Sequence, residues 1–76
     1  MTLRTFYILV ERALAVNPSW RYGQALFNTL YRVRPDLSEQ VRGSNMDPFF
    51  SDGSGDDPRL IRFGEFLNAN WDRNKT

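Results

Sequence analysis

Candidate catalytic groups are scarce in this chain, because its 76 residues include neither His nor Cys. His is the side chain best suited to proton transfer near neutral pH, and Cys is a strong nucleophile. Glu11, Glu39 and Glu65 could act as acids or bases, but each has an ordinary place on a helix surface or at a helix cap. Disulfides and the usual zinc sites are excluded as well, since they need Cys or His. We therefore predict a protein that is not an enzyme and that uses no cofactor.

The polar, glycine-rich stretch of residues 51–57 raises the question of a calcium site. Asp52, Ser54 and Asp56 match the first three ligand positions of a calcium-binding loop. The sixth and twelfth positions, however, hold Asp and Phe where the loop needs Gly and a bidentate Glu. The sequence therefore favours a mobile loop without a metal.

The whole chain contains nine Arg and one Lys against nine acidic residues. Arg32, Arg34 and Arg42 surround a helix–proline–helix corner, and Arg21 and Tyr22 could extend this patch. Contacts to phosphate dominate nucleic-acid binding, so a binder of this kind usually shows a clear basic excess. That excess is missing, and a DNA- or RNA-binding regulator is therefore the alternative reading.

A protein-binding surface explains the aromatic and arginine residues better. Tyr22 and Tyr31 are large amphipathic side chains, and nearby arginines complete the composition of interface anchors. The two Trp residues, by contrast, are expected to pack at the edge of the core. The predicted partner-binding residues are Arg21, Tyr22, Gln24, Asn28, Tyr31, Arg32 and Arg34.

Three of these residues are not needed for a turn, a cap or a close backbone contact, and they could instead form a buried polar network. Gln24 or Asn28 could bond to the turn at residues 43–48, and Arg34 could pair with Asp47. The sequence leaves open whether Gln24, Asn28 and Arg34 are structural or functional.

Hydrophobic residues at three- and four-residue steps predict the first two helices. The first covers residues 3–16, begins at a Thr2 cap and ends before Pro18. The second runs from about residue 20 to residue 34 and is capped by Ser19. Gly23, inside this second helix, predicts a close approach to the first helix.

Two further helices follow a proline break. Asp36 is expected to cap a short helix over residues 37–42, with Glu39 completing a capping box and Gly43 as a left-handed stop. Asp47-Pro48 starts a turn that ends in an apolar Phe49-Phe50 clasp, and Asp57-Pro58 opens the last helix. The inner face of that last helix is expected to comprise Leu60, Phe63, Gly64, Leu67 and Trp71.

Three motifs together resemble a set of small bacteriophage-encoded proteins. They are W-R-x-G-Q-A-x-F-N-x-L at 20–30, R-P-D-L at 34–37 and V-R-G-x-x-x-D-P-F at 41–49. The resemblance covers about residues 18–71, but this sequence has a longer and more glycine-rich insert at residues 51–57. The resemblance implies a phage origin and action in the bacterial cytoplasm, and it implies no particular activity.

These observations predict a single all-α domain over residues 1–76, a compact small bundle of three main helices plus one short helix. Residues 73–76 are expected to fray. The apolar run at residues 6–10 is far shorter than the roughly 20 residues that a membrane span needs. We therefore expect no membrane association and a cytoplasmic location.

The predicted function is that of a small phage accessory protein that binds a host protein and modulates or inhibits it. Inhibition of a host defence system is one version of this function. A nucleic-acid-binding regulator and a self-associating structural or virion-related protein are the alternatives. The sequence does not identify the partner or the oligomeric state.

Overall fold

The computed structural model describes residues 1–51 and 56–72, and it confirms the all-α fold. Four helices and a 3-10 turn, η1, follow one another along the chain. They are α1 (Leu3–Val16), α2 (Tyr22–Val33), α3 (Pro35–Val41), η1 (Pro48–Phe50) and α4 (Pro58–Asn70). No strand occurs in the described residues, and none of their helices is long and apolar enough to cross a membrane.

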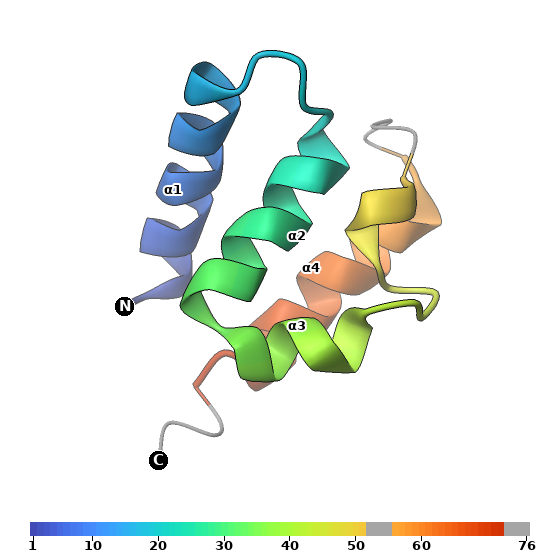
Figure 1. The fold of residues 1–76 in the computed structure, drawn as a ribbon. Helices are drawn as coiled ribbons and strands as arrows, with labels where there is room; N and C mark the ends of the chain where they lie inside the picture. The colour runs from blue at the N-terminus through green and yellow to red at the C-terminus, as the bar shows by residue number, and fades with distance from the viewer. Residues whose placement is uncertain (52–55, 73–76) are drawn as a thin grey trace.

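Helix α2 lies at the centre of the fold. It packs against α1 on one side and against α3 and η1 on the others, while α4 passes behind it (Figure 1). The buried apolar residues of all four helices form one core. Its members are Phe6, Val10, Ala25, Leu26, Phe27, Leu30, Leu37, Val41, Phe63, Leu67 and Trp71.

The boundaries of α1 confirm the sequence prediction. The Thr2 hydroxyl oxygen accepts a hydrogen bond from the Thr5 backbone N–H at 3.1 Å, which satisfies one of the free donors at the helix start. At the other end, the Asn17 side-chain amide donates to the Ala13 carbonyl, and Pro18 follows. Proline there keeps the preceding residue out of the helical conformation.

The start of α2 corrects the sequence prediction, because Ser19 is not its cap. Trp20 instead closes a turn by donating its backbone N–H to the Asn17 carbonyl, and the helix begins at Tyr22. The Gln24 side-chain oxygen accepts from the Arg21 backbone N–H at 2.8 Å. This is half of a capping box, because an arginine side chain has no acceptor with which to complete the other half.

The start of α3 is a second correction. The helix begins at Pro35, whose missing N–H costs nothing at a first helical position. Asp36 therefore lies inside the first turn rather than capping it, and Glu39 pairs with Arg42 instead of forming a capping box. The predicted left-handed stop is confirmed, since Gly43 has a φ of 73°.

Gly23 permits a close contact, but its neighbour is η1 and not α1 as predicted. An added Cβ at Gly23 would collide with the Pro48 carbonyl oxygen and would lie 3.4 Å from the Ser51 Cβ. The absence of a side chain at this position therefore lets the backbone of η1 lie directly on α2. Pro48 is fully buried at this contact.

Asp47 anchors the segment that leads into η1. Its carboxylate accepts from the Gly43 backbone N–H at 2.7 Å and from the Phe49 backbone N–H at 3.0 Å. The side chain is 2% exposed and is occupied by these two bonds. The predicted Arg34–Asp47 pair is wrong, because Arg34 pairs with Asp36 instead.

Helix α4 begins as predicted, with Asp57 as its cap and Pro58 in its first turn. The Asp57 carboxylate accepts from the Arg59 backbone N–H at 2.8 Å and from the Ser51 hydroxyl at 2.9 Å. This cap thus joins the two sides of the polar insert. The predicted loop mobility and the frayed tail concern mainly residues 52–55 and 73–76, which lie outside the described residues.

We expect the variants Gly23→Ala and Gly64→Ala to change stability in opposite directions. The first forces a Cβ into the Pro48 carbonyl and should lower the free energy of unfolding by about 1–3 kcal/mol. The second meets nothing within 4 Å inside α4 and should raise it by up to about 1 kcal/mol, because Ala is the better helix former. Urea unfolding of both variants measures the difference. A Gly23→Ala protein as stable as wild type would contradict the contact.

Candidate functional site

The seven predicted partner-binding residues do not form one surface. They spread around α2 and its two ends: two complete the fold, three line two hollows, and Arg21 and Tyr22 do neither. Gln24 and Arg34 belong to the first group, while Asn28, Tyr31 and Arg32 belong to the second.

Arg21 and Tyr22 lie at the start of α2. Arg21 is exposed, and its backbone N–H is bound by Gln24, so the Gln24 amide serves the helix start. Tyr22 is 37% exposed and lies near α1. Burial, together with the nearby Glu11 carboxylate, raises the pKa of the Tyr22 hydroxyl. Neither residue borders the two hollows described below.

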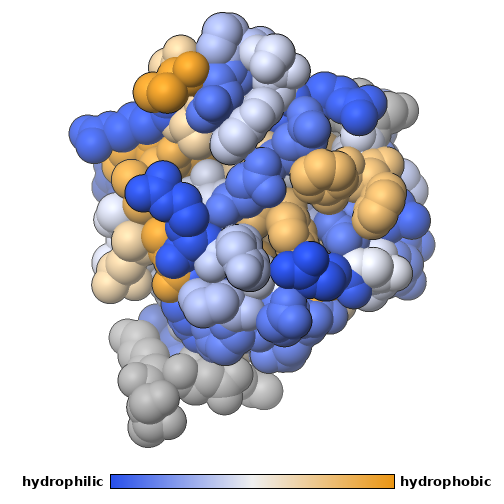
Figure 2. Space-filling model, viewed as in Figure 1, coloured by the Kyte–Doolittle hydropathy of each residue, from blue (hydrophilic) through white to orange (hydrophobic). Residues whose placement is uncertain are grey.

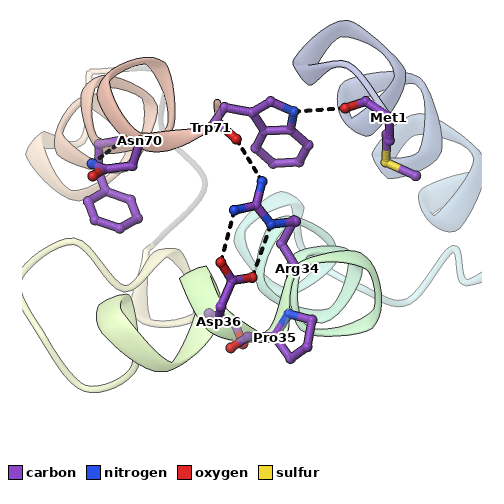
Figure 3. A network of polar contacts seen from close by, with 8 residues as sticks. Met1, Arg34, Pro35, Asp36, Asn70 and Trp71 are labelled. Atoms are coloured by element: carbon purple, nitrogen blue, oxygen red, sulfur yellow. Dashed lines mark hydrogen bonds and ion pairs between the residues drawn. The ribbon is translucent and has the colours of Figure 1, made fainter. Parts of the chain in front are cut away.

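Arg34 joins the end of α2 to the end of α4 (Figure 3). Its guanidinium donates to both carboxylate oxygens of Asp36, at 3.0 and 2.9 Å, and a third N–H donates to the Trp71 carbonyl at 2.7 Å. The same guanidinium lies 5.1 Å from the centre of the Trp71 ring. The Trp71 indole N–H in turn donates to the Met1 carbonyl at 3.1 Å. Arg34 therefore connects three distant parts of the chain.

The double hydrogen bond between Arg34 and Asp36 shifts the pKa values of both groups. The bond to Arg34 lowers the pKa of the Asp36 carboxyl and raises the pKa of the Arg34 guanidinium. A planar guanidinium matches a carboxylate in two places, which a lysine cannot do. These contacts give Arg34 a structural role.

The first hollow is bordered by aromatic side chains on α2 and η1. We call this surface the aromatic face and define it as Phe27, Tyr31, Arg42, Phe49 and Phe50. It surrounds a hollow of about 480 Å³, which Asn28, Gly43 and Asp47 also line. In Figure 2 apolar side chains gather over η1 and beside α2, with hydrophilic atoms around them.

Ring contacts hold the aromatic face together. Phe27 and Phe49 meet edge to face with their centres 6.2 Å apart, and Phe49 and Phe50 do so at 5.9 Å. The Arg42 guanidinium lies 5.2 Å from the Phe27 ring and 5.6 Å from the Tyr31 ring, within the range of cation–π attraction. Phe27 is buried, whereas Tyr31 is 54% exposed and Phe50 is 65% exposed.

The predicted Phe49-Phe50 clasp is partly exposed, and its Phe49 ring packs edge to face against the buried Phe27. Pro48 is the buried residue, and Phe49 is 36% exposed. In a tight 3-10 turn, successive side chains point in different directions, so burying Pro48 against Gly23 turns the next two residues outward. The predicted partner-binding residues do not include Phe49 and Phe50, and Arg42 is considered there only as part of a nucleic-acid patch. The adjacent pair of Phe residues was the available signal, because a single turn rarely buries both.

The second hollow is a groove between α1 and α2. Its volume is about 230 Å³. One stripe of α1 and one stripe of α2 form its walls, and the connection between the helices closes one end. The lining residues are Leu9, Arg12, Ala13 and Val16 of α1, Asn17 and Trp20 of the connection, and Asn28, Thr29, Arg32 and Val33 of α2.

The described residues offer no group of three or more His, Cys, Asp or Glu side chains that could hold a metal ion. The calcium reading of the insert falls largely on residues 52–55, which lie outside that description. No family model, no curated protein and no solved structure matches this chain. The resemblance to small phage proteins therefore stays a prediction.

We expect Arg34→Lys to lower the free energy of unfolding by about 1.5–3 kcal/mol, because lysine cannot hold Asp36 and the Trp71 carbonyl together. Arg62→Lys on the exposed face of α4 is the matched control and should change stability by no more than about 0.5 kcal/mol. Chemical unfolding measures both. Equal stability of the two variants would show that the network contributes nothing.

The Arg34–Asp36 pair should also make stability depend on pH. Because the folded pKa of Asp36 lies below its usual value of 3.8, the pair stabilises the fold above that pH. The contribution is lost as the pH falls from about 3.8 through the lowered pKa. Between about pH 5 and about pH 2, we expect the thermal midpoint of Asp36→Asn to fall less than that of wild type, because the variant has no carboxylate to protonate. Parallel curves for the two proteins would contradict the assignment.

Proposed function

We propose that the chain is a non-enzymatic binding domain that engages a protein partner through the aromatic face. The observation that carries the proposal is the exposure of Tyr31 and Phe50 beside a hollow floored by Phe27, with Arg42 stacked on the rings. Aromatic residues and Arg are enriched at the centres of protein interfaces, where they supply most of the binding energy. A partner would bury the exposed rings and insert an apolar side chain into the hollow.

The charges around the aromatic face favour a protein over a nucleic acid. Exposed rings beside arginines can also stack nucleobases, but such sites track the phosphates with a positive groove. Here Arg42 pairs with Glu39 at 2.9 Å, and Arg59 donates to the Ser44 carbonyl at 2.8 Å. Both cations next to the rings are thus already engaged, and the chain carries a net charge of only +1.

The resemblance to small phage proteins makes a bacterial host protein the first partner to look for. Binding at the aromatic face would then modulate or inhibit that protein, and a host defence system is one target class. Self-association through the same rings is the second candidate, because two copies could cover each other's exposed Tyr31 and Phe50. Mass measurements at increasing concentration separate the two: a concentration-dependent dimer supports self-association.

The decisive experiment compares two double variants in a nuclease-treated bacterial lysate. Tyr31→Ala/Phe50→Ala removes the exposed rings of the aromatic face, while Ile8→Ala/Ile61→Ala removes exposed apolar side chains from α1 and α4. We expect wild type and the Ile double variant to capture the same protein in stoichiometric amount. The aromatic variant should lose at least about tenfold in affinity, because central aromatic anchors contribute about 2 kcal/mol or more each.

Thermal unfolding should show all three proteins folded, since the changed side chains are exposed. Capture that survives loss of Tyr31 and Phe50 would reject the aromatic face as the binding surface. Capture that disappears with nuclease would instead support the nucleic-acid reading.

A further inference from the structure

The groove between α1 and α2 has features that the aromatic face lacks. It lies on the α1 side of α2, and Asn28 is the one described residue that lines both hollows. On α1 its wall follows Leu9, Ala13 and Val16, which are spaced as one helical stripe. Val16 is 78% exposed, so the upper end of this stripe is an apolar surface open to solvent.

Cations line this groove, and no acidic side chain does. Arg12 stands on the α1 wall and Arg32 on the α2 wall. Both are exposed, and neither forms an ion pair with a described residue. They differ in this from Arg34 and Arg42, whose charges are met by Asp36 and Glu39. On the left side of Figure 2, hydrophilic side chains cross an apolar band.

We propose that this groove binds an acidic amphipathic helix of a protein partner. Two adjacent helices with an apolar seam form the receiving surface in helix-in-groove recognition, where the ligand inserts side chains spaced at i, i+3, i+4 and i+7. The apolar walls receive those side chains. Arg12 and Arg32, one on each wall, pair with carboxylates on the two flanks of the ligand helix.

The same arginines could meet phosphates, but the floor of the groove argues against nucleic acid. Its lining side chains Leu9, Ala13, Val16 and Val33 are aliphatic and offer no hydrogen bond to a nucleotide. Trp20 is the one aromatic residue among the described residues that line it, whereas sites that hold single strands stack successive bases on several rings. An apolar seam with a cation on each side matches instead a helix that has one apolar face and acidic flanks.

The test is selection from a displayed library of random peptides, with the full chain as bait. We expect the recovered peptides to be acidic and to carry apolar residues at helical spacing. Binding of a recovered synthetic peptide is then measured by fluorescence polarisation against three variants: Arg12→Glu/Arg32→Glu, Val16→Asp and Tyr31→Ala/Phe50→Ala. The first two should weaken binding by at least about tenfold, through like-charge repulsion and loss of the apolar wall, and the third should leave it unchanged.

Circular dichroism checks that the Arg12→Glu/Arg32→Glu protein folds. The neutral variant Arg12→Gln/Arg32→Gln should bind the peptide with an affinity between those of wild type and the charge-reversed protein. Recovery of no peptide, or of basic or uncharged peptides only, would overturn the proposal. So would peptides that bind the Arg12→Glu/Arg32→Glu protein as well as wild type. An oligonucleotide that binds wild type and is lost in that variant would assign the groove to nucleic acid instead. Because the aromatic variant is tested in parallel, failure at the groove and failure at the aromatic face are distinguishable.

Discussion

The close contact between Gly23 and the Pro48 carbonyl determines how η1 lies on α2. Any side chain at position 23 would lift η1 off α2. The chain around this contact is fixed as well, because the Asp47 carboxylate holds the backbone N–H groups on both sides of the turn. Burial of Pro48 then leaves Phe49 partly exposed against Phe27 and Phe50 65% exposed. The aromatic face is thus a consequence of one backbone approach.

A second constraint closes the fold at its opposite end. The end of α2, the start of α3, the end of α4 and the first residue of the chain meet around Arg34 and Trp71. Trp71 also packs its ring against Phe6 of α1, with ring centres 5.4 Å apart. A small helical chain without disulfides has few ways to fix its ends. Here one guanidinium and one indole do so with directed hydrogen bonds on top of apolar packing.

The two proposed surfaces follow from the central position of α2. One stripe of α2 is buried in the core. On either side of that stripe α2 borders a hollow, one shared with α1 and the other shared with η1. The hollows differ in chemistry. The one beside η1 is lined mainly by aromatic rings, and its Arg42 pairs with Glu39. The one beside α1 has aliphatic side chains together with Trp20, and its arginines form no ion pair with a described residue. Such a domain could hold two segments of one partner, or two partners, on opposite sides of one helix.

The elements that depend on local rules could be predicted from the sequence. The Thr2 cap, the Asp57-Pro58 helix start and the left-handed Gly43 follow from hydrogen bonding and backbone sterics within a few residues. Most of the core could be predicted as well, because helical spacing marks which side chains turn inward. The helix starts at Tyr22 and Pro35 were misplaced, because Trp20 closes a turn with the Asn17 carbonyl before α2 and the Asp36 carboxylate bonds the Arg34 guanidinium instead of capping α3. The long-range partner of each polar or small residue could not be predicted in this way. Arg34 reaches across 37 residues to the Trp71 carbonyl, and Gly23 meets η1 and not α1, because such contacts depend on how the helices pack and leave no periodic trace in the chain.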